Sequence, residues 1–266
     1  MSIQRAKKVL DIEAAAIRGL KNRINRDFEE IVGKIARIKG RVIVTGMGKP
    51  GFIAQKISAT LASTGTPSLF LHPAEALHGD VGRVTKDDCV IALSNSGETE
   101  EICKLIPIVK KIGVLLVSMV GNPKSTLAEN SDYVLNTRVK QEACSLGLAP
   151  TASTTAMLAM GDALAVALLD KKGFKEKDFA FYHPGGSLGR KLLLTVGDIM
   201  RTGGENPIVD EGALVKDVLL KITRARAGSA SVVTPEGRLP VFLPTAICGA
   251  TWTAGRTSPT ALSGMS

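Results

Sequence analysis

The chain has 266 residues, of which 44% are hydrophobic, and its formal net charge is +9. This length and apolar content suffice to bury a full core, which excludes a disordered chain and suits one large domain with a smaller appendage. The basic excess raises the question of nucleic acid. However, aromatic residues are few and not interleaved with basic ones, which favours an anionic small molecule over a nucleic-acid partner.

Neither a membrane span nor a targeting segment is predicted. No apolar run approaches the roughly 20 residues that cross a bilayer, and the N-terminus has acids inside it and no signal-peptide core. We therefore expect a cytoplasmic protein without a membrane partner. A helical pattern covers residues 4–38, where apolar side chains recur at Val9, Ile12, Ala16, Leu20 and Ile24.

Five short β-rich runs follow, and helical patterns separate several of them. The runs are RVIVT (41–45), PSLFLH (67–72), CVIALS (89–94), VLLVSM (114–119) and YVLNT (133–137). Continuous apolar strands that alternate with helices indicate a parallel sheet covered on both faces. Residues 1–195 are thus predicted to form an α/β, three-layer αβα sandwich with a five-stranded parallel sheet, in which the apolar helix beginning TASTTAM is deeply buried.

The first strand leads into Gly46-x-Gly48-x-x-Gly51, the spacing of a dinucleotide-binding turn. In such a fold the second strand ends in an acid that binds the ribose, but here it ends LFLHP and offers His72. Lys49 also lies inside the turn, where a pyrophosphate needs close backbone approach. NAD is therefore disfavoured, and a Walker loop is excluded because GxxxxGK[ST] is missing.

The third strand continues through Ser94-Asn95-Ser96-Gly97-Glu98-Thr99 into an amphipathic helix. Hydroxyls and unpaired backbone N–H groups at the positive end of a helix favour an anion, and Gly97 allows close approach. These residues alone leave a second interpretation open, a Ser/Thr cap without a ligand.

Five motifs in order carry a family resemblance. They are VTGMGKPG, LASTGTPSLFLHPAEALHGDVG, LSNSGETEEI, EACSLGLAPTASTTAMLAMGDALA and HPGGSLGRKLL. Over about residues 1–240 the chain resembles the arabinose 5-phosphate isomerases, which are sugar isomerase (SIS) domain proteins with a following pair of CBS modules. The resemblance implies interconversion of D-ribulose 5-phosphate and D-arabinose 5-phosphate, towards the KDO sugar of lipopolysaccharide or capsule. It also implies a homo-oligomer, a tetramer with active sites at subunit interfaces.

An aldose–ketose isomerase needs a base, a proton shuttle, and a cation or donor near the developing enediolate oxygen. The resemblance implies Lys49, Glu101, Glu142 and His183 as catalytic residues, with Glu142 or His183 as base and shuttle and Lys49 as the stabilising charge. From the residues alone, Glu101 also fits a first-turn acid that complements the helix dipole. His183 likewise fits a structural loop histidine, and Lys49 a solvated cation. This chemistry requires no metal or organic cofactor.

Substrate contacts are predicted from the resemblance and from the serine-rich turn. The predicted substrate-binding residues are Gly48, Gly65, Thr66, His72, His78, Ser94, Ser96 and Thr99. His72 is also a position at which relatives bind zinc, as a bound or inhibitory ion. His72 and His78 flank Glu75 but lack the HxxxH register of a helical metal site, and the four cysteines form no CxxC pair. Substrate contact is therefore favoured over a metal at His72.

The glycine turn departs from the family pattern at two positions. Pro50 stands where the family usually has Ser, and Phe52 replaces a residue that is commonly His or Leu. A hydroxyl that could contact phosphate is lost, whereas proline is tolerated in the first turn of a helix.

The character of the sequence changes after Leu194. Residues 196–242 predict a linker, strand, helix, strand, turn and strand, an incomplete small α+β module that we interpret as a partial CBS module. From Gly237 to Ser266 there is no Asp, Glu or Lys, and another reading frame gives a continuation that resembles the family. Residues 243–266 are therefore interpreted as a frameshifted, disordered tail.

Two other functions stay open. One is a non-catalytic SIS protein that senses a sugar phosphate, although the complete set of four catalytic positions and the lack of a DNA-binding module argue against it. The other is an isomerase of a different phosphosugar, such as a hexulose phosphate.

Overall fold

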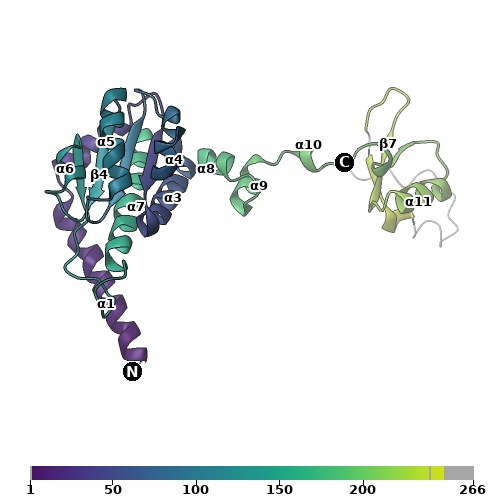
Figure 1. Cartoon of the computed structure of the whole chain (residues 1–266). Helices are drawn as coiled ribbons and strands as arrows, with labels where there is room; N and C mark the ends of the chain where they lie inside the picture. The colour runs from purple at the N-terminus through teal and green to yellow at the C-terminus, as the bar shows by residue number, and fades with distance from the viewer. Residues whose placement is uncertain (1, 240, 249–266) are drawn as a thin grey trace. The chain divides into compact units, whose positions relative to one another are not determined.

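The computed structural model describes residues 2–239 and 241–248, and of Ser187 and Leu188 it describes only the backbone. The chain divides into two compact units, Met1–Leu193 and Leu194–Ser266 (Figure 1). The division lies close to the boundary predicted at residue 195. Each unit has its own buried apolar cluster.

The first unit holds a parallel sheet with the strand order β2-β1-β3-β4-β5. Its elements are α1 (Ser2–Leu20), η1 (Lys21–Arg23), α2 (Arg26–Ile35), β1 (Val42–Gly46), α3 (Gly48–Ser63), β2 (Ser68–Leu71), α4 (Pro73–Leu77), η2 (Asp80–Arg83), β3 (Cys89–Ser94), α5 (Glu100–Ile112), β4 (Leu115–Val120), α6 (Thr126–Glu129), β5 (Tyr133–Asn136), α7 (Ala152–Lys172), α8 (Glu176–Tyr182) and α9 (Ser187–Leu193). All five predicted strands are confirmed.

Helices cover both faces of this sheet. Successive strand residues point to opposite faces, so Val44 and Ile91 join the cluster that contains side chains of α2, α3 and α7. Ile43 and Val90 join the cluster formed with α4, α5 and α6. This arrangement confirms the three-layer αβα sandwich.

Helix α7 is the long apolar helix that the sequence predicted to be buried. Ala156, Met160, Leu164 and Leu168 are all within the core. By length and composition alone α7 could cross a membrane, with a mean hydropathy of 1.5 over its most apolar window. Half of that window is buried inside the protein, as in the core helix of a globular domain.

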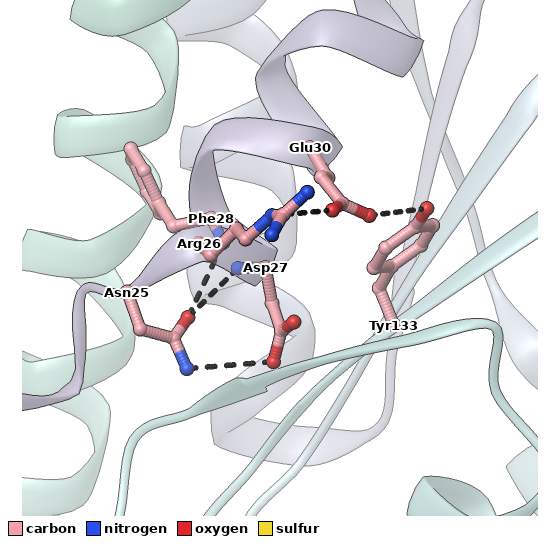
Figure 2. A network of polar contacts seen from close by, with 6 residues as sticks. All are labelled: Asn25, Arg26, Asp27, Phe28, Glu30 and Tyr133. Carbon is pink, nitrogen blue, oxygen red and sulfur yellow. Dashed lines mark hydrogen bonds and ion pairs between the residues drawn. The ribbon is translucent and has the colours of Figure 1, made fainter.

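The helical pattern over residues 4–38 is interrupted. The chain leaves the helix after η1, and Asn25 caps the start of α2 by accepting hydrogen bonds from the backbone N–H groups of Asp27 and Phe28 (Figure 2). Glu30 then pairs with Arg26 at 3.3 Å and accepts a hydrogen bond from the Tyr133 hydroxyl at 3.2 Å. These contacts tie α2 to β5 at the edge of the sheet.

The second unit is a small α+β module. It contains α10 (Val196–Ile199), η3 (Gly203–Glu205), β6 (Ile208–Asp210), α11 (Val215–Arg224), β7 (Ser229–Val233) and β8 (Val241–Pro244). Strand β7 lies between β6, which is parallel to it, and β8, which is antiparallel. The predicted order of strand, helix, strand and strand is confirmed, whereas the CBS assignment stays a prediction.

The predicted start of a disordered tail at residue 243 was wrong for the first residues. Leu243 pairs with Ala230 in the β7–β8 ladder, and Cys248 is 2% exposed in the cluster with Val218 and Ile222. Apolar side chains in this stretch fill the small core, which explains why it is ordered without acidic residues. The rest of the predicted tail, residues 249–266, lies outside the described residues.

Candidate active site

The strand order of the sheet reverses between β1 and β3. From β1 the chain crosses through α3 to β2 on one side, whereas β3 pairs with β1 on the other side and leads to β4. Open α/β sheets bind ligands where the strand order reverses in this way. The segments that follow β1 and β3 are therefore the expected site, and both carry predicted residues.

The segment after β1 places Lys49 at this edge. Gly48 has a φ of +60°, and Lys49 follows it in the exposed first turn of α3. A Cβ on Gly51 would lie 2.6 Å from the Gly46 carbonyl oxygen. Close packing of the turn against its own helix thus accounts for the glycines without a dinucleotide. Pro50 lies within the first turn of α3, where proline is tolerated.

The segment after β3 is a tight turn built from its own hydroxyls. The Ser94 Oγ accepts a hydrogen bond from the Gly97 N–H at 3.0 Å and lies 2.7 Å from the Thr99 Oγ1. The Ser96 Oγ accepts one from the Glu98 N–H at 3.2 Å. Ser94 is 1% exposed and shapes the turn from inside, so Ser96 and Thr99 are the hydroxyls that reach its surface.

Backbone donors remain unused at the start of α5. Thr99 is the N-cap but its side chain makes no capping bond, and within the described residues the N–H groups of Glu100 and Glu101 donate to no acceptor. Such donors at the positive end of a helix bind anions. The Ser96 and Thr99 hydroxyls and the first turn of α5 thus offer donors to an anion, and the anion site itself stays a prediction.

Three acids at the start of α5 differ in their partners. Glu98 accepts a hydrogen bond from the Thr126 N–H at 2.8 Å, and Glu100 pairs with Lys104 at 2.6 Å. Glu101 is half-buried and has no hydrogen bond or ion pair within the part of the chain that the structure describes. Only Glu101 of these three therefore keeps its carboxylate free for a ligand.

Glu142 lies in the loop between β5 and α7 and is held at the start of α7. Its Oε2 accepts hydrogen bonds from the Thr151 N–H at 2.9 Å, the Thr151 hydroxyl at 3.0 Å and the Ser153 N–H at 3.2 Å. Burial raises the pKa of Glu142, but the hydrogen bonds from Ser153 and Thr151 outweigh it and lower that pKa below its usual value. The carboxylate is therefore ionised at neutral pH.

His72 follows β2 beside the glycine turn. A hollow of about 160 Å³ lies there, lined by His72, Phe70, Phe52, Gln55 and the three glycines of the turn. The His72 Nδ1 is buried and has no hydrogen-bond partner among the described residues. A polar atom that is buried and unpaired suits contact with a ligand. His78 is exposed at the end of the short helix α4.

Comparison with known proteins identifies the family. Residues 34–167 match the SIS domain family model. The arabinose 5-phosphate isomerase KdsD of Pseudomonas aeruginosa is 51% identical over 237 residues, which cover 89% of this chain and 73% of that protein. The corresponding enzyme of Yersinia pestis is 55% identical over 236 residues, which cover 89% and 72%. The chain belongs to the arabinose 5-phosphate isomerase family of SIS-domain proteins.

A solved structure agrees with this family. The Escherichia coli CFT073 protein c3406, in complex with arabinose 5-phosphate, is 44% identical and superposes with a TM-score of 0.66. The alignment covers 68% of this chain and 97% of that one. The resemblance predicted from the five motifs is therefore confirmed, and so is the SIS fold.

Not all residues that the family resemblance implies come together in one chain. Gly65 and Thr66 lie between α3 and β2, at the amino edge of the sheet, where the Lys172 ammonium group donates to the Thr66 hydroxyl at 2.9 Å. The ring of Phe174 packs against Gly65 and stacks on Tyr182, which directly precedes His183. The ring of His183 stacks on the ring of Phe179, and the His183 Nδ1 forms a hydrogen bond of 2.8 Å with the carbonyl oxygen of Phe179.

Helix α7 separates these two groups of residues. It starts beside Glu142 at the carboxyl edge and ends at Lys172 at the amino edge, and its 21 residues span about 30 Å. Lys49, Glu101 and Glu142 thus share one edge with His72 and the serine-rich turn. Gly65, Thr66 and His183 lie at the other edge of the same chain.

The structure adds residues that the sequence analysis did not single out. Thr151 and Ser153 hold Glu142, and the Thr151 Oγ1 also accepts a hydrogen bond from the Ala143 N–H at 2.8 Å. The available signal was a run of Ser and Thr directly before an apolar helix, which is typical of an N-cap. Among the residues that the structure describes, no three or more His, Cys, Asp or Glu side chains cluster where they could hold a metal ion. Zinc at His72 stays a prediction.

Proposed function

We propose that this chain interconverts D-ribulose 5-phosphate and D-arabinose 5-phosphate. The observation that carries the proposal is the identity of more than half to arabinose 5-phosphate isomerases. The position of Lys49, Glu101 and Glu142 at one edge of the sheet supports it. From this substrate class we infer the pathway. The enzyme would supply arabinose 5-phosphate for the synthesis of KDO, a sugar of lipopolysaccharide or capsule.

The phosphate is assigned to the serine-rich turn. The Ser96 and Thr99 hydroxyls and the unused N–H groups at the start of α5 present several donors to one anion. This placement puts the sugar carbons at the same edge of the sheet as Lys49 and Glu142. A crystal soaked with inorganic phosphate tests it: density against Ser96 and Thr99 supports the assignment, and density only at Gly46–Gly51 contradicts it.

Proton transfer is assigned to the ionised carboxylate of Glu142. In the forward direction it takes a proton from C1 of the ketose, forming an enediolate, and a proton is returned to C2 to give the aldose. Lys49 stabilises the negative oxygen of the enediolate. Glu101, which has a free carboxylate, and His183 relay the proton between the two oxygens. These steps consume no metal or organic cofactor.

His183 is assigned to this site from a second copy of the chain. It lies at the amino edge of its own sheet, about 30 Å along α7 from Glu142. In a homo-oligomer, which we propose is a tetramer, the amino edge of one copy can face the carboxyl edge of another. His183 of one copy then lies close to Glu142 of the other. Gly65 and Thr66 then contact the substrate from the same neighbouring copy. We place the assembly in the cytoplasm.

Turnover of ribulose 5-phosphate by the purified chain tests the function. Proton NMR of the mixture should show arabinose 5-phosphate forming without added metal or cofactor, and chelator should leave the rate unchanged. Binding of pentose phosphate without turnover would instead support a sensor, and turnover of only a hexulose phosphate would support another isomerase.

A further inference from the structure

Helix α1 carries two apolar stripes, of which the chain uses one. Val9, Ile12, Ala16 and Leu20 are partly or fully buried on the side that packs against α7. Ile3, Leu10 and Ile17 lie on a different side and are 72%, 67% and 42% exposed. Figure 1 shows the N-terminal turns of α1 extending past the rest of the first unit. The second stripe therefore has no cover within that unit.

The spacing of the exposed stripe is that of a helix–helix seam. Apolar residues stand at Ile3, Ala6, Leu10, Ala14 and Ile17, which are three or four residues apart throughout. Such a repeat keeps one line of side chains directed at a partner helix. The large side chains of Ile3, Leu10 and Ile17 alternate with alanines at positions 6 and 14. The small alanine side chains allow two helices to approach closely.

The seam is also symmetric about Leu10. When a second α1 lies antiparallel with its Leu10 against Leu10, Ile3 is level with Ile17 of the second copy and Ala6 is level with Ala14. A two-fold axis requires this self-complementarity. Charge favours the same direction: parallel pairing sets Lys7 beside a second Lys7, whereas antiparallel pairing sets Lys7 level with Glu13.

We propose that the exposed face of α1 is an interface with a second copy of this chain, in which two α1 helices pack antiparallel about Leu10. The Arg5 guanidinium donates to the Ala143 carbonyl oxygen at 2.5 Å, so α1 is bonded to the loop that holds Glu142. That bond lies on the side of α1 that faces α7, so it fixes the helix and leaves the exposed stripe uncovered. The proposal holds whether or not the chain is an isomerase.

Single-cysteine cross-linking of the full chain tests the pairing. Leu10→Cys should form a disulfide-linked dimer on addition of an oxidant, at least five-fold above Gln4→Cys, whose position is exposed on another side of α1. The wild-type chain gives the background from the native cysteines. A cross-link no stronger than that background would overturn the proposal.

A second pair of variants tests the direction. Ile3→Cys should link to Ile17→Cys when the two chains are mixed but not to itself, because antiparallel pairing sets the two Ile3 positions about 21 Å or more apart. Self-linking of Ile3→Cys would overturn the antiparallel arrangement. Leu10→Lys should lower the mass of the assembly at least two-fold by sedimentation, while Gln4→Lys should not. An unchanged mass for Leu10→Lys would show that the stripe has another occupant, such as the second unit of its own chain.

Discussion

The two edges of the five-stranded sheet differ in what their segments do with polar groups. At the carboxyl edge, Glu101, Lys49 and the start of α5 leave charges and N–H groups unused. At the amino edge, polar groups are paired within the chain, as in the bond from Lys172 to Thr66. The carboxyl edge therefore leaves groups available to a ligand, and under the proposed function the amino edge contributes to a site only from a second copy.

The largest expected effect comes from removing acid–base groups at either edge. Glu142→Gln and His183→Ala should each lower kcat by roughly 10²-fold or more, the scale of losing a general acid or base. Glu100→Gln is the matched control, because Glu100 pairs only with Lys104 on the surface. Near-normal turnover by both variants would remove the catalytic roles of Glu142 and His183.

A smaller effect is expected at the serine-rich turn. Gly97 has a φ of +72°, and a Cβ there would lie 1.9 Å from the Ser125 Oγ. Gly97→Ala should therefore destabilise the turn by about 1–3 kcal/mol and raise KM for the sugar phosphate. Thermal unfolding and steady-state kinetics measure the two effects. Gly113→Ala is the control, because it also has a positive φ but meets no atom and lies away from the site.

Thr151→Val tests how the carboxyl edge holds its carboxylate. The variant keeps the backbone bond to Glu142 and loses the hydroxyl bond to it, which is worth about 1.5–3 kcal/mol for a charged acceptor. It also loses the bond that this hydroxyl accepts from the Ala143 N–H. The pKa of Glu142 should rise, so the acid limb of the pH–rate profile should move to higher pH. A profile identical to that of wild type would contradict this role of Thr151. Thr154→Val is the control, since its hydroxyl bonds only the Thr151 carbonyl oxygen.

The same carboxylate predicts a pH dependence of stability. Because the pKa of Glu142 is lowered in the folded protein, its stabilising contribution is complete at neutral pH. It is lost as the pH falls from about 4.3, the usual glutamate value, through the lower folded value. Denaturant unfolding between pH 7 and 3 should therefore show a steeper loss for wild type than for Glu142→Gln. Parallel curves would contradict this contribution.

The smallest effect is expected from the polar groups of the amino edge. Thr66→Val removes one neutral hydrogen-bonding group, worth about 0.5–1.5 kcal/mol, and should raise KM several-fold with little change in kcat. Lys171→Met, next to Lys172 and exposed, is the control. An unchanged KM for Thr66→Val would show that the Thr66 hydroxyl does not contact the substrate and serves only to bond Lys172.

Much of the fold follows from local sequence patterns, because short apolar strands and amphipathic helices differ in period. The break between α1 and α2 does not follow from such a pattern, because residues 4–38 keep one helical period. The sign of the break is Asn25, which caps the start of α2. The order of the strands is also tertiary information. The motifs selected Lys49, Glu142 and His183 together, whereas the structure places the first two at one edge of the sheet and His183 beyond the far end of α7. Their roles in the site stay predictions.

Subunit complementation tests most directly the claim that the two edges act together from different copies. Glu142→Gln and His183→Ala, each inactive alone, are mixed under conditions that exchange subunits, with exchange followed by native mass spectrometry. Random mixing of a two-copy site should restore roughly a quarter of wild-type activity, because half of the assemblies are mixed and each keeps one intact site of two. Exchanged assemblies that remain inactive would contradict the shared site.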